Sequence, residues 1–121
     1  MSYFPFFREI EGEKCLVIGG GKVAARKISR LKGFGVKIKV VAPSIVSDIE
    51  AMAQDCDNIS IERRIFTPQD IENADFVIAA AGEEVDKGAA RLCKEKGIPV
   101  NVVDNQELCD FIFPSIVQKG D

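Results

Sequence analysis

Short apolar runs alternate with amphipathic stretches along most of the chain. Runs of this kind are typical of buried strands, because a strand that is covered on both faces has a nearly continuous apolar sequence. They predict strands at residues 14–18, 36–41, 59–65, 76–81 and 99–103, with a short sixth strand at 111–116.

The amphipathic stretches between these runs predict helices at residues 23–31, 45–54 and 83–96. Ser44 is placed to cap the second helix. Strands that alternate with helices form a parallel sheet with right-handed crossovers. We therefore expect one α/β domain over residues 1–121, a Rossmann-type parallel sheet of order 3-2-1-4-5 with helices on both faces. Ligands of such sheets bind beyond the carboxyl ends of the strands, where the strand order reverses.

A glycine-rich turn joins the first predicted strand to the first helix. Gly19-x-Gly21-x-x-Ala24 has the spacing of dinucleotide-binding folds. Gly19 permits a sharp turn, Gly21 lets backbone amides approach a diphosphate, and Ala24 lets the helix pack closely on the sheet. The positive end of the helix then faces the phosphates. Lys22 either pairs with a phosphate or points into water.

The second predicted strand ends without the acidic residue that often holds the ribose of NAD. The chain continues into Pro43 and Ser44, and the first acid that follows is Asp48. Backbone groups and the Ser44 hydroxyl would then hold the ribose. These residues leave the choice between NAD and NADP open.

Asp104 follows the fifth predicted strand and is therefore expected to face the ligand crevice. A carboxylate that is partly removed from water there has a raised pKa and can act as a general base. The alternative is that Asp104 caps the turn at residues 104–107. Asn101, within the strand, is placed to hydrogen-bond a ligand or a neighbouring loop.

Composition and charge exclude several classes of function. The chain has no signal-peptide pattern and no apolar segment long enough to span a membrane. Its basic residues lack the interleaved aromatic residues of a nucleic-acid surface. Four scattered cysteines and no histidine predict reduced thiols, a cytoplasmic location and no metal site.

The charge is distributed unevenly along the chain. Residues 1–42 hold nine Lys and Arg against three acids, whereas residues 43–121 hold seven against sixteen. The basic residues of the first helix either form a solvated face or attract an anionic ligand.

Four segments of the chain together resemble one family. They are Tyr3–Phe7, residues 19–27 (GGGKVAARK), Val41–Pro43 and residues 101–114 (NVVDNQELCDFIFP). The chain resembles the precorrin-2 dehydrogenase/sirohydrochlorin ferrochelatase family, which also forms the N-terminal module of siroheme synthase. The resemblance covers essentially the whole chain, and the second and fourth segments are its most specific parts. The first segment is expected to form a hydrophobic flap packed on the edge of the sheet.

The resemblance implies an NAD-dependent oxidation of the tetrapyrrole precorrin-2 to sirohydrochlorin and, in some members, insertion of ferrous iron. It implies that Asp104 is the catalytic base, and that Lys22, Val23, Pro43 and Ser44 contact the cofactor. It also implies a dimerisation segment and a helical domain beyond this chain, and a homodimer in the full-length protein. The eight carboxylates of precorrin-2 give the basic N-terminal part an electrostatic purpose.

The turn after the fourth predicted strand departs from the family's pattern. Members place a hydroxyl and a carboxylate in this turn and an Asn after it, whereas this chain has Ala80-Ala81-Gly82-Glu83 and then Lys87. The alternative hypothesis is therefore a nucleotide-binding domain with a regulatory or sensing role and no catalysis.

Overall fold

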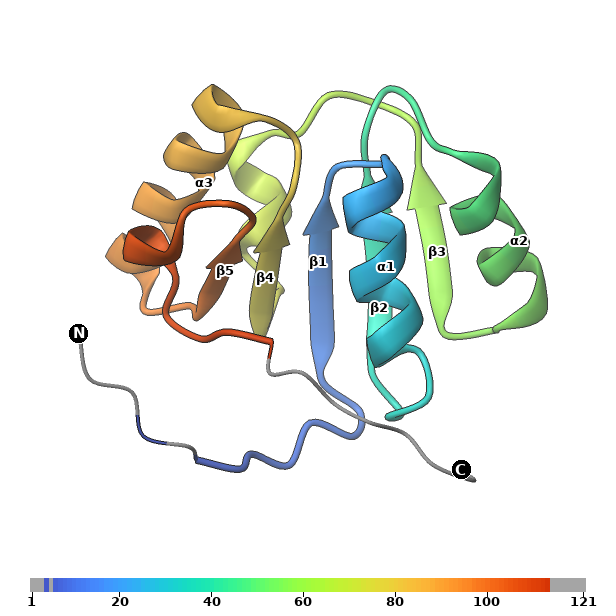
Figure 1. Ribbon diagram of the computed structural model, residues 1–121, viewed down its shortest axis with the longest axis horizontal. Helices are drawn as coiled ribbons and strands as arrows, with labels where there is room; N and C mark the ends of the chain where they lie inside the picture. Colours follow the sequence, from blue (N-terminus) through green and yellow to red (C-terminus); the bar gives the residue numbers. More distant parts are fainter. Residues whose placement is uncertain (1–3, 5, 114–121) are drawn as a thin grey trace.

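A five-stranded parallel sheet forms the centre of the protein (Figure 1). The computed structural model describes residue 4 and residues 6–113. The strands are β1 (Lys14–Ile18), β2 (Lys37–Val41), β3 (Ile59–Glu62), β4 (Phe76–Ala79) and β5 (Val100–Val102). They pair in the order β3-β2-β1-β4-β5, and each neighbouring pair is parallel. The predicted strand order is confirmed.

Helices cover both faces of this sheet. They are α1 (Lys22–Leu31), α2 (Ser47–Asp55) and α3 (Glu83–Lys96), together with the short 3-10 helices η1 (Pro68–Ile71) and η2 (Gln106–Leu108). One apolar core joins α1 and α2 to one face, and a second core joins α3 and η1 to the other. The predicted Rossmann-type arrangement is therefore confirmed.

The position of β1 at the centre of the sheet explains why residues 15–18 are all apolar. Cys15 and Val17 belong to the core on the α1 side, and Leu16 and Ile18 belong to the core on the α3 side. All four are at most 2% exposed. Alternate residues of a strand point to opposite faces, so a strand that is covered twice has no polar face.

The carboxyl ends of the strands meet at one edge, the upper edge in Figure 1, which we call the carboxyl edge. The register places Ile18, Ala79 and Val102 in one row across β1, β4 and β5. Each of the three residues ends its strand. The loops that follow these strands therefore start from the same level of the sheet.

The second helix starts later than predicted, and Ser44 does not cap it. The residue before α2 is Val46, whose N–H donates to the Gly20 carbonyl over 2.8 Å. The Ser44 carbonyl also lies against Gly20. This segment is held against the glycine turn, so the helix cannot begin before Ser47.

The predicted sixth strand is wrong for Phe111–Phe113, which are not part of the sheet, and residues 114–116 lie outside the described residues. Asp110 instead ties the chain back to β5. Its N–H donates to the Val100 carbonyl over 2.7 Å, and its carboxylate accepts from the Val100 N–H over 3.1 Å.

The N-terminal aromatic residues do not form the predicted flap. Phe4, Phe6 and Phe7 are 76%, 85% and 100% exposed, and Tyr3 and Pro5 lie outside the described residues. The rings of Phe4 and Phe6 contact each other with centroids 5.2 Å apart instead of packing on the edge of the sheet.

An ion pair fixes the connection from β3 to β4. Arg64 donates to both carboxylate oxygens of Asp70, and the Thr67 N–H donates to the same carboxylate over 2.8 Å. The strand β3 ends at Glu62, three residues earlier than predicted, as the chain turns into this connection. The Arg64 guanidinium is the main reason that the pKa of Asp70 lies below its ordinary value.

Asp70→Asn is expected to lower the free energy of unfolding at neutral pH by about 1 kcal/mol, because a neutral amide with one oxygen cannot serve both donors. Arg64 is partly exposed, so screening by water keeps the loss small. A lowered folded-state pKa means that the stabilisation is present above the unfolded-state pKa, near pH 4, and is lost as the pH falls through the folded value. Urea unfolding of both proteins at falling pH measures this. An undiminished difference near pH 2 would contradict it.

Candidate functional site

The turn between β1 and α1 is packed against the loops on either side of it. Gly19 has φ +126°, and a Cβ there would lie 2.2 Å from the Ala80 carbonyl oxygen. A Cβ on Gly20 would lie 2.2 Å from the Ser44 carbonyl oxygen. Sequence reasoning missed Gly20, because the spacing motif leaves that position open to any residue. The turn is thus held between the β2 side and the β4 side of the carboxyl edge.

Gly21 and the first turn of α1 form an open cradle. A Cβ on Gly21 would have no neighbour within 4 Å, and Gly21, Lys22 and Val23 are exposed. The first N–H groups of α1 have no acceptor within the helix, and no acidic residue lies in its first turn. Ala24 is fully buried against the sheet. Free amides, the positive end of the helix and a lysine suit a diphosphate, so these residues fit a dinucleotide.

Pro43 and Ser44 flank this cradle on the β2 side. Both are exposed, and the Ser44 carbonyl contacts the glycine turn. No acidic residue stands at the end of β2, as the sequence indicates. Their part in holding a ribose stays a prediction.

Asp104 reaches the same edge of the sheet from β5, but it is exposed and not partly buried as predicted. It has φ +59° and is the one non-glycine residue with a positive φ in the described part of the chain. The Asn105 N–H donates to the Val102 carbonyl over 3.3 Å and closes this turn. A left-handed conformation is uncommon for a residue with a side chain, and such residues gather at functional sites.

Lys27 connects α1 to the loop that follows β5. Its Nζ atom lies 4.3 Å from the centroid of the Phe113 ring. Burial lowers the pKa of Lys27, the charge of Arg30 lowers it further, and the charges of Cys109 and Asp104 act in the opposite direction. A cation on α1 and the Asp104 carboxylate are thus within electrostatic reach of each other.

Asn101 is only 4% exposed and serves the structure of this loop. Its side-chain amide donates to the Phe111 carbonyl over 2.9 Å, while its Oδ1 atom has no hydrogen-bond partner among the described residues. The hydrogen bond to a neighbouring loop, which was one of the two alternatives, is therefore present.

Asp86 is a buried carboxylate that sequence reasoning missed. It is 3% exposed and accepts hydrogen bonds from the Ala81 and Gly82 N–H groups, over 2.9 and 3.3 Å. Burial raises the pKa of Asp86, and these two hydrogen bonds partly oppose that effect. An acid near the start of a helix is so common in sequences that nothing marked this one as different.

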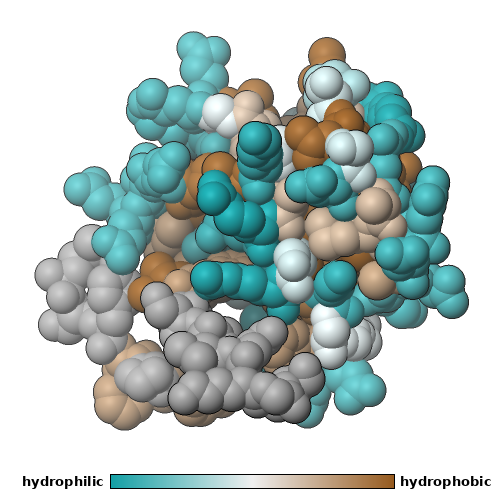
Figure 2. Space-filling model, turned by 45° about the vertical axis from the view of Figure 1, so that its right-hand side comes forward, coloured by the Kyte–Doolittle hydropathy of each residue, from teal (hydrophilic) through white to brown (hydrophobic). Residues whose placement is uncertain are grey.

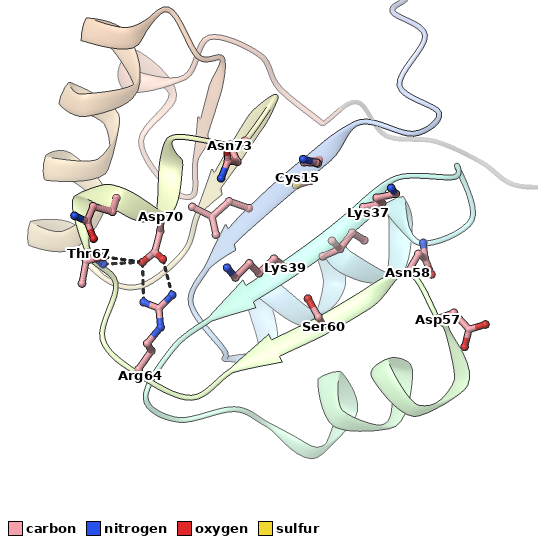
Figure 3. Close-up of a pocket in the computed structure, with 15 residues that line it drawn as sticks. Cys15, Lys37, Lys39, Asp57, Asn58, Ser60, Arg64, Thr67, Asp70 and Asn73 are labelled. Carbon is pink, nitrogen blue, oxygen red and sulfur yellow. Dashed lines mark hydrogen bonds and ion pairs between the residues drawn. The ribbon is translucent and has the colours of Figure 1, made fainter.

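A trough of about 870 Å³ lies over β1, β2 and β3, on the face opposite α1 (Figure 3). Lys39 in it pairs with Glu62 over 2.8 Å, and Arg64 pairs with Asp70. It contains none of the predicted site residues. Charged groups that neutralise each other on an open sheet face are typical of a solvated surface, so the trough is not part of the site.

Some hydrophobic residues near the carboxyl edge are exposed. Hydrophilic residues cover much of the visible face, and hydrophobic residues come to the surface near its upper end (Figure 2). Val23 and Ile65 are 37% and 74% exposed. None of the described helices is long and apolar enough to cross a membrane.

All four cysteines are free thiols. Cys15 and Cys93 are buried, whereas Cys56 and Cys109 are partly exposed. Burial raises the pKa of Cys93 to about 11 and raises that of Cys15 further. Such thiols are protonated and unreactive at neutral pH.

Comparison with known proteins identifies the family. A family model described as "Putative NAD(P)-binding" matches residues 6–115. The chain belongs to this NAD(P)-binding family. The solved structure titled "SirC, precorrin-2 dehydrogenase" has the same fold, with a TM-score of 0.78 and 22% identity over 98% of this chain and 58% of that one.

Siroheme synthases are similar to this chain over nearly its whole length. The protein from Nitrosomonas eutropha is 42% identical over 99% of this chain and 25% of its own length. The protein from Thioalkalivibrio sulfidiphilus is 39% identical over 99% of this chain and 24% of its own. The chain thus spans about a quarter of the length of the curated relatives that it matches.

Two alanine substitutions are expected to separate binding from folding at the glycine turn. Gly21→Ala fills only open space, so the free energy of unfolding should change by less than about 1 kcal/mol, while NAD affinity should fall about tenfold. Gly19→Ala meets the Ala80 carbonyl at a strained φ and should cost about 2 kcal/mol of stability. Calorimetric titration with NAD and thermal unfolding measure the two effects. Unchanged NAD affinity of Gly21→Ala would place the diphosphate elsewhere.

Proposed function

We propose that this chain is the dinucleotide-binding part of an NAD-dependent precorrin-2 dehydrogenase, which oxidises precorrin-2 to sirohydrochlorin in siroheme biosynthesis. One observation carries this proposal. The Gly21 cradle and Asp104 come to one edge of the sheet, in a chain whose whole length is similar to siroheme synthases. The resemblance to a precorrin-2 dehydrogenase fold supports the same conclusion.

The oxidation removes one hydride and one proton from the reduced macrocycle. Oxidised NAD supplies the chemistry by accepting the hydride. The free amides after Gly21 and the Lys22 ammonium would hold the diphosphate, and Pro43 and Ser44 would hold the adenosine ribose. Asp104 takes the proton on its carboxylate. No histidine competes for this role, because the sequence contains none.

The position of Asp104 agrees with a role that depends on the rest of the protein. In this chain water reaches its carboxylate. Since the relatives are about four times longer, we propose that parts outside this chain complete the tetrapyrrole cleft and remove that water. A carboxylate that loses water becomes a stronger base. Lys27, on the same side, would attract the carboxylates of the substrate.

We also propose that the full-length protein is a homodimer in the cytoplasm. An apolar groove of about 470 Å³ lies between the N-terminal segment and the end of α1, and exposed Phe6, Phe34 and Ile112 line it. Exposed apolar surface of this kind marks interaction sites. Free thiols throughout the chain support a reducing compartment.

Asp104→Asn in the full-length protein is expected to lower kcat for precorrin-2 oxidation about 10²- to 10⁴-fold, because the variant has no base for the proton. NAD affinity should stay the same. The assay follows the absorbance of the macrocycle and of NADH. Glu107→Gln is the matched control, since Glu107 is an exposed acid three residues further along the same segment.

The results of this assay distinguish between hypotheses about Asp104 and about the function of the chain. Equal turnover of Asp104→Asn and wild type would remove Asp104 from the mechanism. A full-length protein that binds NAD but never converts precorrin-2 would favour the regulatory or sensing domain, in line with the missing hydroxyl in the Ala80–Gly82 turn. Ferrous iron insertion by the same two proteins tests whether Asp104 also serves chelation.

A further inference from the structure

One buried carboxylate fixes the loop between β4 and α3 by hydrogen bonds. Asp86 lies in the first turns of α3 and accepts from the Ala81 N–H through Oδ1 and from the Gly82 N–H through Oδ2. α3 has no side-chain cap at Gly82, and the Asp86 carboxylate instead accepts from N–H groups of the loop that leads into the helix. Both oxygens of the carboxylate are used on two successive amides of one loop.

The direction of these amides determines what the loop presents to the carboxyl edge. The described chain has no cis peptide bonds, and in a trans peptide the N–H and the C=O point in opposite directions. Because the Ala81 and Gly82 N–H groups point at Asp86, the Ala80 and Ala81 carbonyls point away from it. The Ala80 oxygen is indeed the atom that approaches Gly19.

These two carbonyls are acceptors without a partner. Neither accepts a backbone hydrogen bond among the described residues, whereas the carbonyls on either side do: Ala79 accepts from Val103 and Gly82 accepts from Asp86. The loop also lies next to the point where the strand order reverses, between β1 and β4. The adenosine half of a dinucleotide lies toward β2 in such sheets, so the other half lies toward β4.

We propose that Asp86 is a positioning residue for the nicotinamide end of the cofactor: it turns the Ala80 and Ala81 carbonyls toward the crevice, where they accept hydrogen bonds from the carboxamide. This rests on the proposed use of NAD. The loop thereby selects a ligand that carries N–H donors at this end. The hydroxyl that is missing from this turn is not needed, because backbone oxygens accept these hydrogen bonds.

Asp86→Asn tests this with three ligands. NAD carries the carboxamide, 3-acetylpyridine adenine dinucleotide replaces its amide nitrogen with a methyl group, and ADP-ribose lacks the ring. In the variant the side-chain amide presents a donor to one of the two loop N–H groups, so the loop must shift. Wild type is expected to bind NAD about 25-fold more tightly than the acetyl analogue, as the loss of two hydrogen bonds would give. In Asp86→Asn this ratio should approach one.

Two controls separate positioning from loss of structure. Glu84→Gln changes an exposed acid in the same helical turn and should keep the wild-type ratio. ADP-ribose should bind Asp86→Asn as tightly as it binds wild type, because the Gly21 cradle is untouched, and thermal unfolding shows whether the variant folds. If Asp86→Asn does not fold, the ratio of the affinities for NAD and for the acetyl analogue is measured in an Ala81→Pro variant instead. Proline at this position removes one of the two N–H groups that bind Asp86.

The outcomes are distinct for the two proposals. A preserved NAD preference in a folded Asp86→Asn protein overturns the role of Asp86 and leaves the cofactor site standing. Equal affinity of wild type for NAD and the acetyl analogue overturns it as well. Failure of wild type to bind either NAD or ADP-ribose overturns the cofactor site itself.

Discussion

The whole carboxyl edge depends on one steric constraint, the absence of Cβ atoms at Gly19 and Gly20. With hydrogen in their place, the turn after β1 lies in contact with the Ala80 and Ser44 carbonyls at the same time. Three loops from β1, β2 and β4 thus have fixed relative positions. Only then does the first turn of α1 point its amides at open space beside Gly21. A methyl group at either glycine would push these loops apart.

Basic and acidic side chains occupy different loops of this frame. The first turn of α1 carries Lys22 and no acid, and Lys27 lies further along the same helix. Asp104 is exposed after β5, and Asp86 is buried beside the loop that follows β4. A diphosphate in the proposed Gly21 cradle would therefore lie on a different loop from these two carboxylates.

Local sequence rules were enough to predict most of the frame, including the strand order and the glycine turn. Their errors occur where distant residues act. Ser44 should cap a helix by its own chemistry, but its carbonyl lies against Gly20 and α2 begins only at Ser47. The apolar residues Phe111–Phe113 should form a strand, but Asp110 ties the chain to Val100. Neither partner is near in sequence. Asp86 was missed because the N–H groups that donate to it belong to a loop whose direction no spacing rule records. The roles of the cofactor-contacting residues stay predictions.

The row formed by Ile18, Ala79 and Val102 fixes the distance between the Gly21 cradle and Asp104. The cradle follows the first of these residues and the proposed base follows the last, so the pairing of β4 with β5 sets the gap between them. A slip of one residue there would move Asp104 by about 3.3 Å and turn it to the opposite face. Mutations in the interior of these strands, distant from every ligand, would then slow the reaction while leaving coenzyme affinity intact.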